Sequence, residues 1–398
     1  MSDLTGVSIE PFRGDLEGLE RMAHTSWRDE YGVSSFPNLY RPAFLRFLFG
    51  RLEHADHLLA AYRNGEIVCF QANLPHRFYF HQKIRRGLWS GLMVSRKEWL
   101  RKGLAAAIIR EAIHINDRYQ NDFALSTFET GHRSTRVLKK LQAEGYRVER
   151  LKRLRVIARI LDVRRVTESE GLKLWERAAV KLIGGDRPPR PARKGSRVGW
   201  PWAPTTPVAE ADPSAMPTGE PTGLVPGGRG ERGPWPPDPN VREYRETDLD
   251  DCLSLFNSYG GKIQLARAWE REELGWELAF PDVSRTLVYE KDGHAQGAIN
   301  FILHDHLGRT RERWAWINHV AYSALTPRQQ AAFVQALLSY VRDLGGIGVI
   351  EWTKGYYSPG AFYRARFFPY FRSLDLYSWT FNPELSLSGV RACNEIVV

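Results

Sequence analysis

The chain has 398 residues, of which 43% are hydrophobic, so it is long enough to form two domains with buried cores. Its formal net charge of +10 favours an anionic ligand, a nucleic acid or an acidic surface, but no zinc-finger, RNP or basic-zipper pattern accompanies the charge. Three cysteines without a pairing pattern suggest a reducing compartment and no cysteine-based metal site, and no apolar run approaches the about 20 residues of a membrane helix.

Residues 1–6 do not resemble a signal peptide, so we expect a cytoplasmic, soluble protein. The pattern up to residue 94 predicts one strand, two amphipathic helices and then three strands. Asn64-Gly65 marks a type I′ hairpin turn between the first two of these three strands. In chain order, the expected elements are strand 7–12, a helix from Asp15 through Trp27, a helix from Pro42 through Leu52, and strands 57–62, 67–80 and 86–94.

A strand, a basic turn and a helix follow one another in residues 92–109. Apolar residues recur at steps of three and four from Gly103 to Tyr119, which predicts an amphipathic helix. Gly103 at its start exposes backbone N–H groups that no helical carbonyl satisfies, and the helix dipole favours an anion there. Arg101 and Lys102 add positive charge at the same place. The stretch predicts a phosphate cradle; the alternative is an ordinary helix start with surface cations.

The cradle resembles the pyrophosphate loop of the GCN5-related N-acetyltransferases. That loop has Gln or Arg, two variable residues, Gly, one variable residue and then a small Gly or Ala. Residues 100–105 read Leu-Arg-Lys-Gly-Leu-Ala. Gly103 and Ala105 match the loop, whereas Leu100 stands where Gln or Arg is usual. The glycine patterns of a P-loop and of a dinucleotide-binding fold are absent.

The elements around the cradle follow the order of one acetyltransferase domain. Strand 123–128, helix 134–145 and strands 147–151 and 153–161 complete this order, so the resemblance covers residues 7–161. Leu141 stands where the family has a tyrosine that protonates the leaving thiolate. The resemblance implies three sets of cofactor contacts: the backbone of Leu92, Met93 and Val94 beside the thioester, the segment Arg101, Lys102, Gly103, Leu104 and Ala105 around the pyrophosphate, and the side chains of Ser134 and Arg136.

A change of composition separates two halves. Of the 23 prolines, 14 lie between residues 188 and 239, and such a segment buries too little apolar surface to fold alone. We therefore predict an acyl-CoA-binding domain at 1–165, a connecting helix at 166–185, a Pro/Gly-rich linker at 186–239 and a second domain at 240–398. Trp200, Trp202 and Trp235 in the linker either pin it to a domain or contact a partner.

The second half repeats the element order of the first. Its segment 322–329 precedes a helix, as the cradle does, but contains no glycine, and Pro327 removes one backbone donor. Tyr363 and the residues after it resemble the family's closing tyrosine segment. The expected elements are strand 241–244, a helix opened by a Thr247–Asp250 capping box, strands 285–290, 295–304 and 314–321, helix 329–344, strand 348–352, helix 360–366 and strand 376–381.

Three groups of side chains are candidates for chemistry. Glu129 follows the strand 123–128 and is the candidate general base; the alternative is a solvated residue at a strand end. His132 is a weaker candidate base, and Tyr363 is the candidate acid, with a role in the core as its alternative. His304 and His306 share one strand face, but no third ligand is in range, so we expect no metal site.

These features predict an α+β fold, a mixed sheet flanked by helices, in two tandem acyl-CoA N-acyltransferase-like domains. The resemblance implies an enzyme that moves an acyl group, acetyl in the first instance, from acetyl-CoA or another acyl-CoA to an amine of a small molecule or peptide. Tandem members of the superfamily include mycothiol synthase, the N-myristoyltransferases and the peptidoglycan-bridge transferases. The alternatives are a non-catalytic acyl-CoA sensor or scaffold and, on charge alone, a nucleic-acid-binding protein. The oligomeric state stays open, with a monomer of pseudo-dimeric domains as one form.

Overall fold

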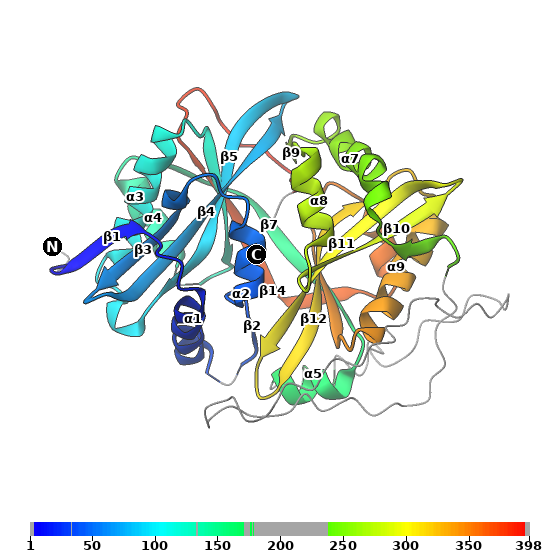
Figure 1. The fold of residues 1–398 in the computed structure, drawn as a ribbon, viewed down its shortest axis with the longest axis horizontal. Helices are drawn as coiled ribbons and strands as arrows, with labels where there is room; N and C mark the ends of the chain where they lie inside the picture. Colours follow the sequence, from blue (N-terminus) through cyan, green and yellow to red (C-terminus); the bar gives the residue numbers. More distant parts are fainter. Residues whose placement is uncertain are drawn as a thin grey trace.

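The computed structural model describes residues 4–32, 34–132, 134–170, 176, 178 and 238–394. The chain forms two lobes joined by a continuous sheet (Figure 1). Most of the predicted connecting helix and the predicted linker with its three tryptophans lie outside the described residues. Helix α5 (Val163–Glu170) begins before residue 166, where the connecting helix was expected.

The first half follows the predicted element order, with one short strand added. Helix α1 begins where the Asp15 carboxylate accepts a hydrogen bond from the Gly18 N–H at 2.7 Å, and α2 begins with Pro42, whose missing N–H is not needed there. The elements are β1 (Val7–Pro11), α1 (Leu16–Tyr31), β2 (Phe36–Pro37), α2 (Pro42–Phe49), β3 (Leu58–Arg63), β4 (Glu66–Phe80), β5 (Lys83–Ser95), α3 (Leu104–Arg118), β6 (Phe123–Glu129), α4 (Thr135–Ala143) and β7 (Arg147–Ile160).

The prediction of two strands between residues 147 and 161 is wrong. Strand β7 is continuous, because its pairing shifts by one residue at Leu151 instead of ending there. Lys152 pairs with Leu376, and Arg150 pairs with the next residue, Tyr377, so Leu151 is the extra residue of a β-bulge. A bulge interrupts the alternation of exposed and buried residues, and for this reason the pattern suggested a strand end.

The second half also follows the predicted order, with two elements added. Its elements are β8 (Val241–Glu243), α7 (Leu249–Asn257), β9 (Leu265–Arg267), α8 (Arg271–Ala279), β10 (Ser284–Lys291), β11 (His294–Leu307), β12 (Arg311–Ala321), α9 (Pro327–Asp343), β13 (Gly348–Trp352), α10 (Gly360–Arg364) and β14 (Phe368–Thr380).

Two local features of the second half differ from the prediction. The sequence pattern missed helix α8, because its apolar residues point to two different cores: Leu274 to the core of the second half and Trp276 to the core that contains α2. The Thr247–Asp250 capping box does not form. Instead the Asp248 carboxylate accepts from the Arg245 N–H at 2.7 Å and forms an ion pair with Arg242 at 2.7 Å.

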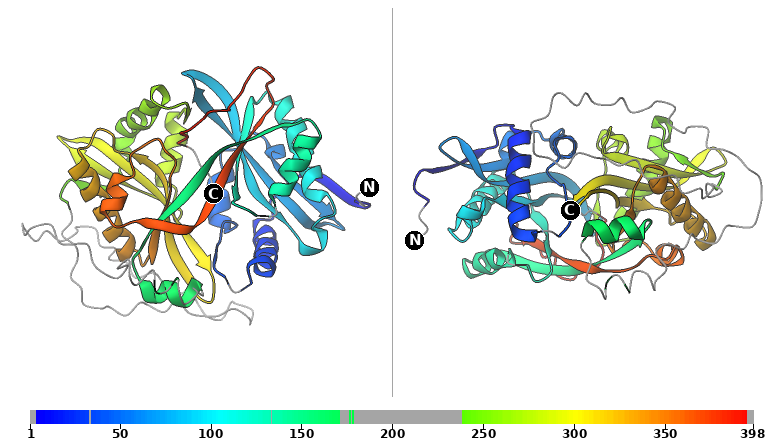
Figure 2. Two further views of the ribbon diagram at one scale, coloured as in Figure 1. Left: turned by 180° about the vertical axis from the view of Figure 1, so that it is seen from behind. Right: turned by 90° about the horizontal axis from the view of Figure 1, so that it is seen from below.

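The two halves exchange strands within one mixed sheet. The strand order is β1-β3-β4-β5-β6-β14-β7-β13-β12-β11-β10-β8, so β14 of the second half lies between β6 and β7 of the first. Strand β7 in turn pairs with β13 of the second half over Val156–Ile160. From behind, β7 and β14 run between the lobes (Figure 2, left). Two short strands also cross over, since β2 pairs with β11 and β9 pairs with β4.

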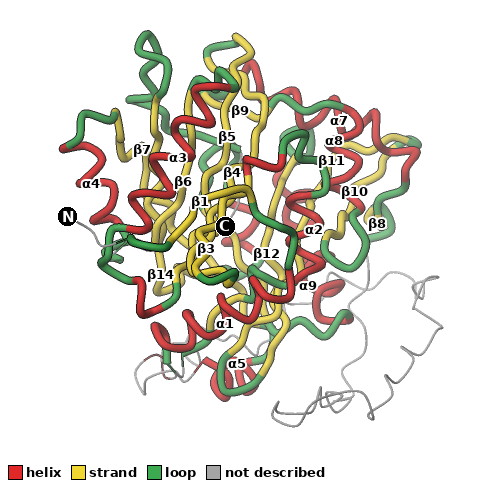
Figure 3. The backbone as a smooth tube through the Cα atoms, turned by 60° about the vertical axis from the view of Figure 1, so that its left-hand side comes forward, coloured by secondary structure: helices red, strands yellow, loops and turns green. Residues whose placement is uncertain are grey.

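Helices cover both faces of the first half's sheet (Figure 3). Helices α1 and α2 pack with β4 and β6 in a core that contains Leu19, Phe44 and Leu125, and this core continues into the second half through Trp314. Helices α3 and α4 pack on the opposite face. The sheet therefore holds the start of α3 beside the ends of β5 and β6.

The strand exchange predicts that the first half does not fold alone. A fragment of residues 1–170 lacks β14, so β6 and β7 each lose a neighbour whose backbone hydrogen bonds contribute about 1 kcal/mol each. We expect this fragment to aggregate, whereas co-expression with residues 238–398 should give a soluble complex with the circular dichroism of the intact chain. Size-exclusion chromatography measures both results, and a monomeric fragment with native-like circular dichroism would contradict the exchange.

Candidate functional site

Helix α3 begins without a side-chain cap. Gly103 is its N-cap in the left-handed region, with φ of 85°, and Arg101 two residues earlier has φ of 65°. The first helical hydrogen bond runs from the Ala107 N–H to the Gly103 carbonyl at 3.0 Å. The N–H groups of the first turn therefore have no intrahelical partner and no capping side chain, which suits a bound anion.

The residues around this helix start are positively charged. Arg101 and Lys102 are exposed, and the first turn of α3 contains no acidic residue. The ammonium of Lys102 lies 4.8 Å from the centre of the Trp99 ring, and the guanidinium of Arg63 lies 5.2 Å from the same ring. Leu100, which departs from the family loop, has 57% of its surface exposed and contributes no charge. The start of α3 is therefore uncapped and carries exposed cations.

A β-bulge lies in β5 just before the cradle. Gly91 pairs with Ala72, and Val94 pairs with Phe70, so Leu92 and Met93 both face the single residue Gln71. Leu92 has φ of 49°, an unusual backbone conformation for a side chain of its size. A bulge leaves a residue of the ladder unpaired, so backbone N–H groups are available here. Of the three predicted thioester contacts, Leu92 and Met93 are in the bulge, and Val94 has returned to the ladder.

Strands β5 and β6 stop pairing next to the bulge. They pair in parallel only over Gly87–Trp89, although both strands continue for several residues. The buried Ser126 hydroxyl donates to the Ser90 carbonyl at 2.5 Å. This carbonyl is therefore bonded to a side chain of β6 and not to a backbone N–H of β6. We call the space between the ends of β5 and β6 the first-half slot.

Glu129 lies at the end of β6, on one side of this slot. It pairs with Leu374 of β14, and its carboxylate accepts a hydrogen bond from the Tyr31 hydroxyl at 3.4 Å. Burial and the neighbouring Glu129 carboxylate raise the pKa of Tyr31 well above its usual range, so this hydroxyl stays protonated and donates.

The last turn of α1 reaches both sides of the first-half slot. Asp29 lies 3.7 Å from the Lys97 ammonium beyond β5, and Tyr31 contacts Glu129 at the end of β6. Glu30 contacts the His132 ring at 2.7 Å. Sequence reasoning missed this role of α1, because its three partners lie 68 to 102 residues away in the chain and no local pattern connects them.

The other predicted site residues divide into two groups. Ser134 is the N-cap of α4, and its hydroxyl contacts the His132 ring at 2.8 Å; Arg136 is exposed in the first turn of the same helix. Tyr363 lies on α10 of the second half, 47% exposed, and the structure does not bring it to the cradle. Leu141, at the position of the family tyrosine, is fully buried in the core beneath α3.

The second half has a closed version of the same arrangement. Thr326 caps α9, accepting from the Gln329 N–H, and the Gln329 side chain accepts in return from the Thr326 N–H at 2.9 Å. Strands β12 and β13 also pair in parallel over three residues and then separate, but the Lys354 side chain enters the gap. The helix start and the slot are therefore satisfied by the chain itself.

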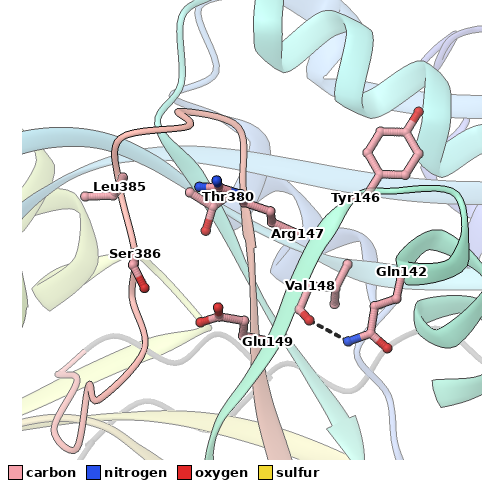
Figure 4. Close-up of a pocket in the computed structure, with 8 residues that line it drawn as sticks. All are labelled: Gln142, Tyr146, Arg147, Val148, Glu149, Thr380, Leu385 and Ser386. Carbon is pink, nitrogen blue, oxygen red and sulfur yellow. Dashed lines mark hydrogen bonds between the residues drawn. The ribbon is translucent and has the colours of Figure 1, made fainter.

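A cavity of about 390 Å³ lies beside the start of β7, between residues of both halves (Figure 4). It contains none of the predicted site residues, so it is separate from the cradle. Among the described residues, no group of three or more His, Cys, Asp or Glu side chains could hold a metal ion. No described helix combines the length and apolar character needed to cross a membrane. The cavity is lined by Gln142, Tyr146, Arg147, Val148, Glu149, Thr380, Leu385 and Ser386.

No protein-family model and no curated protein matches the chain. Solved structures of Saccharomyces cerevisiae N-myristoyltransferase with bound myristoyl-CoA are similar to it. One has a TM-score of 0.69 at 14% identity over 99% of this chain and 90% of that chain. A second has a TM-score of 0.69 at 13% identity and covers 99% of this chain and 85% of that chain. A third, with inhibitors also bound, has a TM-score of 0.68 at 14% identity and covers 99% of this chain and 87% of that chain. The chain therefore has the fold of these N-myristoyltransferase structures, which confirms the predicted fold class of a mixed sheet flanked by helices.

The cradle can be tested with two glycines of similar backbone conformation. We expect Gly103→Asp to abolish binding of coenzyme A, because it places a carboxylate where an anion would lie, and Arg101→Glu to weaken binding strongly. Gly293, in the β10–β11 turn, has φ of 81° and open space where a Cβ would lie, so Gly293→Asp is the matched control for backbone strain. Isothermal titration calorimetry measures the affinities. Unchanged affinity in folded Gly103→Asp and Arg101→Glu variants would exclude the cradle.

Proposed function

We propose that the chain is an N-acyltransferase that moves an acyl group from acyl-CoA to an amine, with the acyl-CoA in the first half. The observation that carries this proposal is the uncapped, cationic start of α3 beside a slot between two separated strands. A pyrophosphate needs several N–H donors and positive charge, and a pantetheine arm needs a narrow channel that ends at the reacting carbonyl. In the first half, the uncapped helix start follows directly after the region where β5 and β6 stop pairing, so both needs can be met by neighbouring residues.

The donor is proposed to be a long-chain acyl-CoA and the acceptor a peptide amine. The similar structures are N-myristoyltransferases that hold myristoyl-CoA, and they match 99% of this chain. Nothing in the sequence specified the chain length of the acyl group. We therefore propose a long-chain acyl group in place of the acetyl group that was expected from the wider superfamily. Acetyl-CoA is the comparison substrate in the test below.

Each step of the reaction has a candidate group in the first half. Arg101, Lys102 and the first N–H groups of α3 would hold the pyrophosphate. The N–H groups at the Leu92–Met93 bulge would stabilise the oxyanion that forms when the amine attacks the thioester carbonyl. Glu129 would take a proton from the acceptor's ammonium, directly or through a water, while the Tyr31 hydroxyl orients its carboxylate. The C–N bond forms as the C–S bond breaks, and the leaving thiolate takes the second proton that the attacking nitrogen loses.

Turnover separates this enzyme from a non-catalytic acyl-CoA-binding protein. We expect the purified chain to release free thiol from myristoyl-CoA in the presence of a peptide with a free N-terminal amine, and to do so faster than from acetyl-CoA. A thiol-reactive dye follows the release, and mass spectrometry identifies the acylated peptide. Tight binding of both donors with no thiol release across a panel of amines and peptides would support the sensor instead.

Glu129→Gln tests the base. Because general base catalysis contributes typically 10² to 10⁴ in rate, we expect kcat to fall about 100-fold or more while the affinity for coenzyme A stays unchanged. Glu98→Gln is the matched control, since Glu98 is exposed and lies in the turn before the cradle. Equal rates for the Glu129→Gln variant and the wild type would remove Glu129 from the mechanism.

The stoichiometry follows from the difference between the halves. We expect one coenzyme A per chain, because Thr326 and Gln329 already satisfy the start of α9 and Lys354 fills the gap between β12 and β13. Native mass spectrometry counts the bound molecules. Two bound molecules of equal affinity would show that the second half is also a cofactor site.

A further inference from the structure

Lys354 is a buried lysine whose ammonium lies among backbone carbonyls. It follows β13 by two residues, and its side chain is fully buried. The Nζ donates to the Ile317 carbonyl at 3.1 Å and also to the Asn318 carbonyl, and it lies 4.0 Å from the Glu351 carboxylate. Two acceptors and one carboxylate thus surround one ammonium, which has three N–H donors to offer.

The ammonium occupies the position that corresponds to the first-half slot. In the first half, Ser90 follows Trp89, the last residue of β5 that pairs with β6. In the second half, Ile317 follows Trp316, the last residue of β12 that pairs with β13. The carbonyl just past the last rung is capped by the Ser126 hydroxyl in the first case and by the Lys354 ammonium in the second.

The register also aligns Lys354 with Glu129. Trp89 pairs with Leu125, and Glu129 lies four residues further on; Trp316 pairs with Ile350, and Lys354 lies four residues further on. The two halves therefore place opposite charges at the same point. A carboxylate stands beside the first-half slot, and an ammonium lies at the corresponding point of the second half.

The surroundings of Lys354 are built for a cation. The pKa of the Glu351 carboxyl is raised to about 7, because the effect of burial outweighs the opposite effects of the Lys354 ammonium and the Tyr357 hydroxyl. Tyr356 closes the gap further along β12, since its hydroxyl accepts from the Val320 N–H at 2.8 Å. The site offers two backbone carbonyls and the Glu351 carboxyl group to the Lys354 nitrogen, and an apolar group of equal size would leave these buried acceptors without their donor.

The same residue holds the C-terminal segment, residues 382–394. The Lys354 carbonyl accepts from the Lys152 ammonium of β7 at 3.0 Å and from the Cys393 N–H at 3.4 Å. Lys152 also donates to the Arg391 carbonyl at 2.8 Å. The Lys354 side chain is held between β12 and β13, and the Lys354 backbone carbonyl contacts the C-terminal segment.

We propose that the second half contains a primary-ammonium site for which Lys354 is the internal ligand, and that a free alkylammonium ion takes this site when the Lys354 side chain is shortened. The proposal stands apart from the acyltransferase function, because it rests on the second half alone. The ligand class is a primary alkylammonium, since a substituted nitrogen has too few N–H donors and an alcohol has no positive charge.

Chemical rescue of Lys354→Ala tests the site. Propylammonium replaces the three methylenes and the nitrogen that this variant lacks. We expect the melting temperature of the full-length variant to fall by about 5–10 °C, because a buried pair is broken, and to recover by at least half as propylammonium chloride is added to saturation. Propan-1-ol and tetramethylammonium chloride at the same concentrations should not restore it. The wild type and Lys262→Ala, which changes an exposed lysine, should show neither effect.

The outcomes decide the proposal in each case. A wild-type melting temperature for Lys354→Ala, or recovery with propan-1-ol equal to that with propylammonium, would show that the side chain only fills space. If Lys354→Ala does not fold, its refolding yield is measured in propylammonium and in propan-1-ol. A yield raised by propylammonium alone supports the ammonium site, and equal yields in the two additives overturn it. Coenzyme A binding, which belongs to the first half, should be unchanged in the rescued variant.

Discussion

Strand β14 supplies the backbone hydrogen bonds that complete the sheet of the first half, although it belongs to the second half in sequence. Its insertion between β6 and β7 decides how the candidate site is built. Strand β6 is held by β14 along its whole length and by β5 over only three residues, so β6 can separate from β5 without losing its place. Glu129, at the end of β6, takes its position from Leu374 of β14. The slot is therefore a product of both halves, even though the residues around it come mainly from the first.

The two halves share an element order and differ in how they satisfy the same backbone groups. At the helix start, the first half has Gly103 and two cations, and the second half has Thr326 with Gln329. Just past the last paired residues, the first half satisfies a strand carbonyl with the short Ser126 side chain, whereas the second half uses the long Lys354 side chain. Because a buried polar group must find a partner, each half had to satisfy these groups either with the chain or with a ligand. The first half leaves such groups for a ligand and is the candidate site, whereas the second half satisfies them with its own side chains.

The ion pairs around the first-half slot bear on position more than on stability. The pair between Asp29 and Lys97 is exposed, and exposed pairs contribute about 0–1 kcal/mol. Its importance is geometric, since it connects the last turn of α1 to one side of the slot while Tyr31 contacts the other side. By contrast, the contacts of Lys354 are buried, where the loss of one partner leaves a charge without compensation.

The sequence by itself determined the order of the elements, the repeat of that order, and the contrast between Gly103 and Pro327 at the two helix starts. These features are local: periodicity, turn residues and helix caps act within a few residues of each other, so they can be recognised without knowing the fold. The tertiary structure decided the strand exchange, the bulge at Leu92, the separation of β5 from β6 and the burial of Lys354. It also separated Tyr363 from the cradle and placed Tyr31 against Glu129. Each of these depends on partners many residues apart, and a backbone group or a charge becomes unsatisfied only when burial removes its water, which no local pattern records.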